Sequence, residues 1–131
     1  MARLSLVSLE RLQGVHPKLA EIVHRAAEIS EVEFRVMEGV RDRGLHALLL
    51  RVGATTITDS RHITGHAVDV VPIVQGMVRW DWPLYSKIAQ AFKKAAQQLG
   101  AAIEWGGEWK KNPDGPHFQL PAHEFPDDQP A

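Results

Sequence analysis

The sequence contains no cysteine, and this absence limits both its cross-links and its chemistry. None of the 131 residues carries a thiol. Disulfides, thiolate metal sites and cysteine nucleophiles are therefore excluded. Histidine, aspartate and glutamate are left as metal ligands, so any zinc site must be built from nitrogen and oxygen donors.

A dominant charge and long apolar runs are also missing. The chain has 15 lysine and arginine residues against 16 acidic ones, a net charge of -1, which does not favour nucleic acid as a partner. No apolar run approaches the length of a membrane span, and the N-terminal run is too short for a signal-peptide core. We therefore expect no membrane insertion, and we expect the protein to stay in the cytoplasm of its host bacterium until something else releases it.

The length and composition are those of one globular unit. With 131 residues, of which 44% are hydrophobic, the chain suffices for one compact domain, residues 1–131, but not for an additional targeting module. We expect this domain to be a monomer.

Apolar spacing predicts a few helices and several short strands. Helical periodicity covers residues 17–29 and 84–99, and a weaker helix is expected over 43–52. Strands are expected over 33–37, 67–71, 77–80, 102–105 and 117–120. Because these elements do not alternate as βαβ units, the sequence predicts an α+β fold with a small, mainly antiparallel sheet and about three helices.

The central segment carries the first two candidate metal ligands. His62 is predicted in a loop and Asp69 in the following strand, and Gly65 lets the chain turn between them. Imidazole and carboxylate are good zinc donors, and a catalytic zinc takes three protein ligands and leaves a fourth position for water. His117 is the best third ligand, because it begins an apolar strand and follows a nearby carboxylate, Asp114.

That carboxylate is the candidate general base. Zinc lowers the pKa of its water to about 7, and a nearby carboxylate can take the proton as hydroxide attacks a peptide carbonyl, then return it to the leaving amine. The short spacing to His117 favours Asp114, although Glu104 and Glu108 remain alternatives. The sequence therefore predicts a hydrolase with one zinc ion per chain.

Together these motifs resemble a known group of zinc peptidases. The pattern Ser-x-His-x-x-Gly-x-Ala-x-Asp starts at Ser60, and Trp-Gly-Gly-x-Trp from Trp105 and Asp-Gly-Pro-His from Asp114 follow downstream. This looks like the LAS group, which includes VanY-like D-alanyl-D-alanine carboxypeptidases and phage L-alanyl-D-glutamate endopeptidases. The resemblance runs from about Pro17 to Pro121 and implies the LAS/Hedgehog-like zinc peptidase fold.

The resemblance also implies a role for each matched residue. It makes His62, Asp69 and His117 the zinc ligands and Asp114 the general base. The carboxypeptidase branch has glutamate as its base, so the aspartate in this chain is similar to the phage endopeptidases.

Five further residues are candidates for contact with substrate. The resemblance implies that Arg41 polarises the scissile carbonyl or holds a substrate carboxylate. Ser60 lies beside a candidate ligand, where its hydroxyl more simply anchors the loop than acts as a nucleophile. His66 is expected behind the ligands or at the surface, because Gly65 argues against a helical zinc motif, and it is a lesser candidate for substrate contact. Trp105 and Trp109 flank a Gly-Gly pair near the base and could line the cleft, although aromatic residues in small domains usually belong to the core.

The resemblance implies a phage or prophage endolysin that hydrolyses the L-Ala-D-Glu bond of the peptidoglycan stem peptide. The aspartate base, the small domain and the lack of an export signal favour this function, and such a lysin would need a holin to reach the wall. The alternatives are a D-alanyl-D-alanine carboxypeptidase, a non-catalytic wall-binding module and a metal-dependent nuclease. The lack of a basic face argues against the nuclease.

Overall fold

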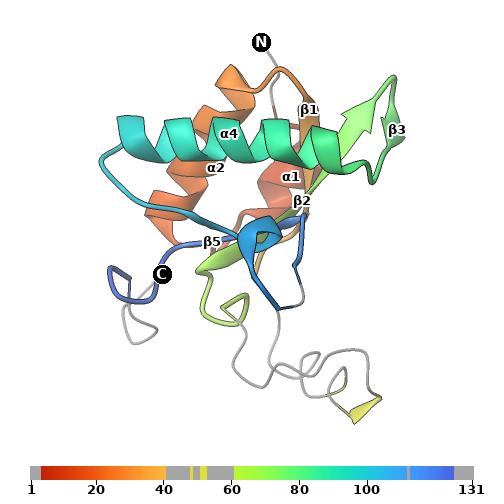
Figure 1. Cartoon of the computed structure of the whole chain (residues 1–131). Coiled ribbons are helices and arrows are strands. Elements are labelled where there is room, and N and C mark those ends of the chain that lie inside the picture. The colour runs from red at the N-terminus through yellow and green to blue at the C-terminus, as the bar shows by residue number, and fades with distance from the viewer. Residues whose placement is uncertain (1–3, 41–47, 49–50, 53–60, 112, 126–131) are drawn as a thin grey trace.

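The computed structural model describes residues 4–40, 48, 51–52, 61–111 and 113–125. In chain order (Figure 1), the elements are α1 (Leu6–Arg11), α2 (Pro17–Ile29), β1 (Glu33–Glu38), β2 (Ala67–Val74), β3 (Met77–Val78), α4 (Trp82–Gln98), β4 (Glu104–Trp105), the 3-10 helix η1 (Gly106–Glu108) and β5 (His117–Gln119). None of the helices described has the length and apolar character that crossing a membrane requires.

The sheet is antiparallel at every pairing between these strands. Its strand order is β1-β2-β5-β4, and β3 pairs with the far end of β2 as a hairpin. The central strand β2 is long and β-branched, as a strand with buried residues on both faces requires. The predicted α+β class with a small antiparallel sheet is confirmed.

The two long helices form the apolar layer that packs with the sheet. Figure 1 shows α4 crossing α2, and the buried side chains of both helices join one core cluster with Val68 and Val70 of β2. At its centre Phe92 of α4 stacks on Phe118 of β5, with ring centroids 4.0 Å apart. Since Val68 and Val70 pack into this core, the period of two in β2 turns the intervening Asp69 to the opposite face.

Most of the predicted elements are confirmed, with ends that differ by no more than three residues. The exception is α1, which sequence patterning missed because its apolar residues Leu6 and Val7 are exposed. Serine hydroxyls hold this helix instead: Ser5 accepts a hydrogen bond from the Ser8 amide, and the buried Ser8 hydroxyl accepts one from the Val36 amide of β1. The helix predicted over 43–52 lies mostly outside the described residues.

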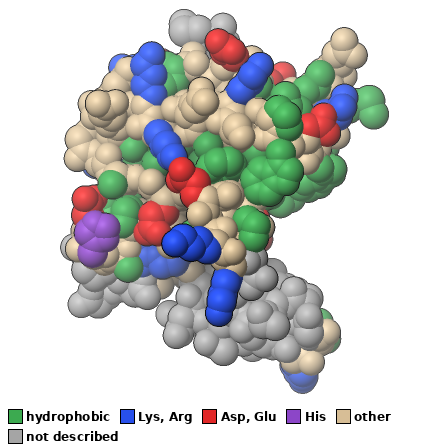
Figure 2. Space-filling model, in the orientation of Figure 1, with side chains coloured by type: hydrophobic (Ala, Val, Ile, Leu, Met, Phe, Trp, Pro, Cys, Tyr) green, Lys and Arg blue, Asp and Glu red, His purple; other side chains and the backbone are tan. Residues whose placement is uncertain are grey.

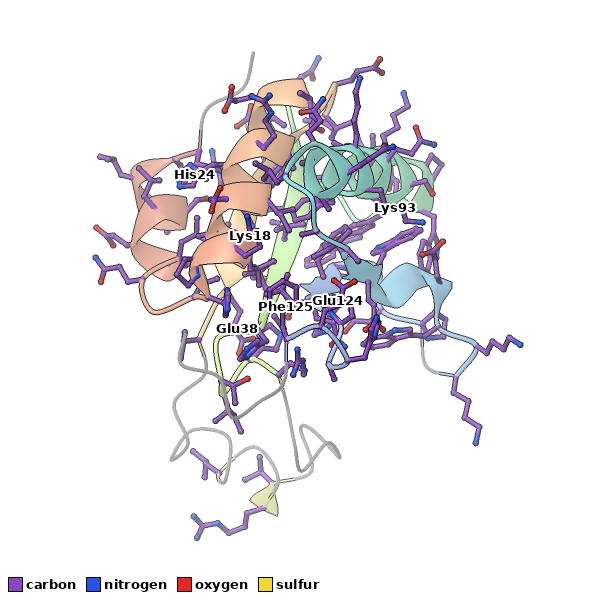
Figure 3. The ribbon with its side chains drawn as sticks, turned by 90° about the vertical axis from the view of Figure 1, so that its left-hand side faces the viewer. Lys18, His24, Glu38, Lys93, Glu124 and Phe125 are labelled. Carbon is purple, nitrogen blue, oxygen red and sulfur yellow. The ribbon has the colours of Figure 1, made fainter. Side chains whose placement is uncertain are left out.

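The described C-terminal segment folds back toward the start of α2. Phe125, labelled in Figure 3, meets the ring of His16 edge-on, with centroids 5.2 Å apart. The Arg61 guanidinium donates hydrogen bonds to the carbonyls of Leu120 and Phe125, at 2.7 and 2.8 Å. The chain after β5 is thereby fastened to the residue that precedes His62.

Candidate active site

Strand pairing brings two of the three predicted ligands together. Asp69 of β2 and His117 of β5 are partners in the antiparallel register, and the Nδ1 atom of His117 lies 3.2 Å from the Oδ1 atom of Asp69. His62 comes from the loop before β2, and its Nε2 atom lies 3.3 Å from the same oxygen. One ligand atom from each residue lies within 4.8 Å of the others.

The loop that carries His62 turns where the sequence predicted a turn. Gly65 has a φ of 80°, a left-handed conformation that glycine adopts without the steric penalty of a side chain. Its amide donates to the His62 carbonyl, and its own carbonyl accepts a hydrogen bond of 2.8 Å from the His16 amide. The start of α2 therefore holds this loop against the sheet.

Each imidazole is oriented by an oxygen on its far side. The Nδ1 atom of His62 lies 2.9 Å from the carbonyl oxygen of Gly39, and the Nε2 atom of His117 lies 2.7 Å from the side-chain oxygen of Gln119. Both oxygens can only accept, so in the neutral rings these nitrogens carry the proton. The lone pairs of the other nitrogens then face Asp69, as in metal sites where an outer acceptor fixes the tautomer of the ligand.

This donor set fits a zinc ion. Two imidazole nitrogens and one carboxylate are common ligands of catalytic zinc, and bonds of about 2.0–2.1 Å in tetrahedral geometry place ligand atoms roughly 3.3 Å apart. The separations of 3.2 and 3.3 Å from the Asp69 oxygen match that value. The side chains of His62 and His117 are 4% and 10% exposed, so water competes little for these donors.

A close turn places Asp114 beside the three residues. The His117 amide donates to the Asp114 carbonyl, and the Asp114 amide donates 2.9 Å to the carbonyl of Gly106. A Cβ atom on Gly106 would lie 3.1 Å from the Cβ atoms of both Asp114 and His117, and would clash with the carbonyl oxygen of Asp114. Glycine is therefore required here, because η1 passes directly against the turn that carries the predicted base.

The charges around Asp114 suit a proton acceptor. Burial and then the carboxylate of Asp69 raise the pKa of Asp114 above its usual 3.8, while His117 and His62 act in the opposite direction. The alternative base Glu108 is exposed and lies 2.6 Å from the Lys93 ammonium. The geometry therefore favours Asp114 over Glu108.

Comparisons with known proteins identify the family of this chain. The family model of phage L-alanyl-D-glutamate peptidases matches residues 1–120. The chain belongs to that family. The L-alanyl-D-glutamate peptidase of Escherichia phage T5 is 31% identical over 82% of this chain and 81% of its own length. A peptidase of the same name from a Listeria phage is 33% identical over 88% of this chain, which spans 40% of that longer relative.

A solved structure is also similar to this chain in its fold. The Serratia marcescens L-Ala D-Glu endopeptidase ChiX has a TM-score of 0.89 and 45% sequence identity, covering 95% of this chain and 93% of its own. This chain is thus a peptidase of the phage L-alanyl-D-glutamate family, as the resemblance implied.

Of the other residues predicted to contact substrate, the structure describes the two tryptophans. Arg41 and Ser60 lie outside the described residues. The Trp109 ring is 5.0 Å from the ring of His117, beside the candidate ligands. Trp105 packs against Phe118 and donates a 2.7 Å hydrogen bond to the Gly115 carbonyl, so it braces the turn that carries Asp114.

His66 lies behind the candidate ligands, the position that the sequence favoured, and its burial argues against the substrate contact that was the lesser possibility. His66 is fully buried, and its Nδ1 atom lies 2.7 Å from the hydroxyl of Thr64, within the loop that carries His62. Its ring also lies 5.3 Å from that of His16. A side chain with no exposed surface presents nothing to a substrate, so His66 supports the loop instead.

Sequence reasoning missed three residues of the peptidase site. Gln119 could have been found, because a strand places it on the same face as His117. Gly106 stands in the Trp-Gly-Gly-x-Trp motif, but nothing in the sequence indicated its role, and Tyr85 gave no local signal. The hydroxyl of Tyr85 is buried without a hydrogen-bond partner among the described residues, and burial followed by the charges of Asp114 and Asp69 raises its pKa to about 12. Tyr85 therefore stays protonated at neutral pH.

The histidine and aspartate pair predicts how the metal-free peptidase responds to pH. Burial favours the neutral ring, but the hydrogen bond and charge of Asp69 outweigh it and raise the pKa of His62 above 6.5. A raised histidine pKa contributes stability below pH 6.5 that is lost as the pH rises through the folded value. Burial alone would raise the pKa of Asp69, but the hydrogen bonds and charges of His117 and His62 lower it below 3.8. The stability that the Asp69 carboxylate contributes is therefore lost only in more acidic solution, as the pH falls through its lowered pKa.

We therefore expect the urea midpoint of the metal-free protein to fall between about pH 6 and pH 8.5. Asp69→Asn is expected to remove or reverse that fall, because the negative charge that raises the pKa of His62 is gone. Unfolding curves of both proteins in chelator, followed by circular dichroism, measure the two slopes. Equal slopes would contradict the role given to the pair.

Proposed function

We propose that this chain is a zinc-dependent endopeptidase that hydrolyses the L-alanyl-D-glutamyl bond in the stem peptide of bacterial peptidoglycan. The observation that carries the proposal is that ligand atoms of His62, Asp69 and His117 lie within 4.8 Å of one another. The turn that carries Asp114 is hydrogen-bonded to the His117 amide and to the Gly106 carbonyl. The names of the phage relatives and of the Serratia structure support the choice of bond.

His62, Asp69 and His117 would hold the zinc ion through Nε2, a carboxylate oxygen and Nδ1 respectively. Bound there, zinc supplies a Lewis acid that polarises the scissile carbonyl and brings the pKa of a water molecule to about 7. Three protein ligands leave room for such a molecule, as catalytic rather than structural sites do. The Gly39 carbonyl and the Gln119 amide keep both imidazoles in the tautomer that binding needs.

Asp114 would move the proton in both halves of the reaction. As the water oxygen forms its bond to the alanyl carbonyl carbon, the Asp114 carboxylate takes the water proton. When the carbon-nitrogen bond breaks, the same carboxyl returns the proton to the departing amine of D-glutamate. Its raised pKa helps the first transfer, because it makes the Asp114 carboxylate a stronger base than an ordinary aspartate.

The predicted substrate contacts outside the described residues complete the proposal. Arg41 would stabilise the oxyanion or bind a substrate carboxylate, and Ser60 would anchor the loop before His62. We also propose that the enzyme acts as a monomer, remains in the host cytoplasm while the phage develops, and reaches the wall with the help of a holin.

The bond that is cut can be identified from its products. Purified peptidoglycan digested by the zinc-loaded enzyme is expected to gain free amino groups on D-glutamate and matching free carboxyl groups on L-alanine, which mass spectrometry after amino-terminal labelling detects. Release of free D-alanine would identify a carboxypeptidase instead. An intact wall with bound protein would identify a non-catalytic binding module.

A further inference from the structure

An exposed apolar surface lies between the hairpin and the start of α4. Met77, Val78, Trp80 and Trp82 are 68%, 45%, 60% and 50% exposed. Figure 2 shows hydrophobic side chains gathered over β3 and the adjoining end of α4. Large exposed aromatic groups are costly to leave in water and commonly mark binding surfaces.

One member of this surface reaches the candidate active site. The ring of Trp82 lies 3.5 Å from the point where a Cβ atom on Gly115 would stand, and Gly115 directly follows Asp114. The same ring is held edge-on by two neighbours, with centroids 6.0 Å from Trp105 and 6.4 Å from Tyr85. Because Trp105 is itself bonded to the Gly115 carbonyl, Trp82 keeps a fixed position relative to the turn that carries the base.

The chemistry of the wall places a sugar close to the scissile bond. The L-alanine of a stem peptide is attached to the lactyl group of N-acetylmuramic acid, so a single residue separates this sugar from the bond to D-glutamate. One extended residue spans about 3.5 Å, and with the lactyl group the sugar ring lies roughly 10 Å from the bond. Gly115 is two residues from His117, at most about 7 Å along the chain, and the Trp82 ring lies 3.5 Å from the Cβ position of Gly115, so a span of roughly 10 Å is enough to join Trp82 to the site.

We propose that Trp82 binds the N-acetylmuramic acid sugar of the substrate by packing its ring against the apolar face of the pyranose. This proposal rests on the peptidoglycan hydrolase function proposed above and assigns the enzyme a second recognition element besides the stem peptide. The C-H groups of one sugar face are apolar, and an immobilised aromatic ring covers them with little loss of side-chain entropy. The half-exposed Trp82 ring offers such a surface next to the turn of Asp114.

The test compares two soluble substrates with the same stem peptide, one free at its L-alanine and one carrying N-acetylmuramic acid there. The wild-type enzyme is expected to cleave the muramyl substrate with the higher kcat/KM. Trp82→Ala is expected to lower kcat/KM for the muramyl substrate about tenfold, chiefly by raising KM. For the free peptide, kcat/KM of the variant is expected to stay within about twofold of the wild-type value. Trp82→Phe, which keeps an aromatic face, is expected to restore most of the difference.

Trp80→Ala is the matched control, because Trp80 is an exposed tryptophan of the same surface whose ring stacks on no other ring among the described residues. It is expected to leave both substrates unchanged. If Trp82→Ala slows both substrates equally, or neither, the sugar contact is refuted while the proposed function stands. If wild-type enzyme cleaves neither substrate at the L-Ala-D-Glu bond, the proposed function itself fails.

Discussion

Asp114→Asn is expected to lower kcat by a factor of about 10² to 10⁴, the range over which general bases contribute to catalysis. Asparagine has nearly the same shape and can keep the backbone hydrogen bonds to Gly106 and His117, but its amide cannot take a proton from water. Zinc content and KM are expected to stay close to the wild-type values. Steady-state kinetics on a defined stem peptide, with metal analysis of the same samples, measure all three quantities.

The control for this experiment is Glu108→Gln, which neutralises a second carboxylate near the same turn. Glu108 is exposed and pairs with Lys93, so its loss is expected to change kcat less than about twofold. A variant of Asp114 that kept full activity would refute the proposed mechanism. Equal losses in both variants would show that kcat follows local charge and not a specific proton acceptor.

The core of the site was predictable because it is encoded locally. His62, Asp69 and His117 each stand in a short motif, and Asp69 attracts notice as the one acidic residue in a β-branched run. The structure adds the reason for their meeting, which is the antiparallel register that sets Asp69 opposite His117. Helices α2 and α4 were predictable for the same reason, since their apolar stripes have the period of a helix.

What the sequence did not predict depends on contacts between distant segments. The carbonyl of Gly39 orients His62 across 23 positions of the chain, and every residue has a carbonyl, so no residue type marks this role. Gly106 matters only because the turn of Asp114 passes against it. His66 was judged from its neighbours in sequence, whereas its burial is decided by packing against α2, around His16.

The metal ligands and the general base are positioned by different parts of the fold. The sheet fixes the spacing of Asp69 and His117. The position of His62 is fixed by the loop before β2, which is hydrogen-bonded to the start of α2 and to the C-terminal segment. Asp114 instead depends on a tight turn braced by Trp105. We infer that changes in the brace would impair proton transfer before they impair metal binding, because the ligands are held by separate elements.

His117→Ala is expected to abolish zinc binding and activity together. It removes one of three protein ligands and leaves His62 and Asp69, which cannot by themselves complete a catalytic zinc site. The wild-type enzyme is expected to hold about one zinc per chain, to lose activity in chelator and to recover it when zinc is added. The variant is expected to hold almost no zinc after dialysis and to remain inactive at any added concentration that the wild type tolerates.

His123→Ala is the matched control, because the side chain of His123 is 78% exposed and pairs only loosely with Glu124, at 3.9 Å. It is expected to keep wild-type zinc content and kcat, which separates a ligand from a surface histidine. Circular dichroism should show that metal-free His117→Ala keeps its helices, since the apolar core around Phe92 and Phe118 does not include the ligand. A folded variant with full zinc content would refute the assignment of His117, and a chelated wild type with full activity would refute metal catalysis altogether.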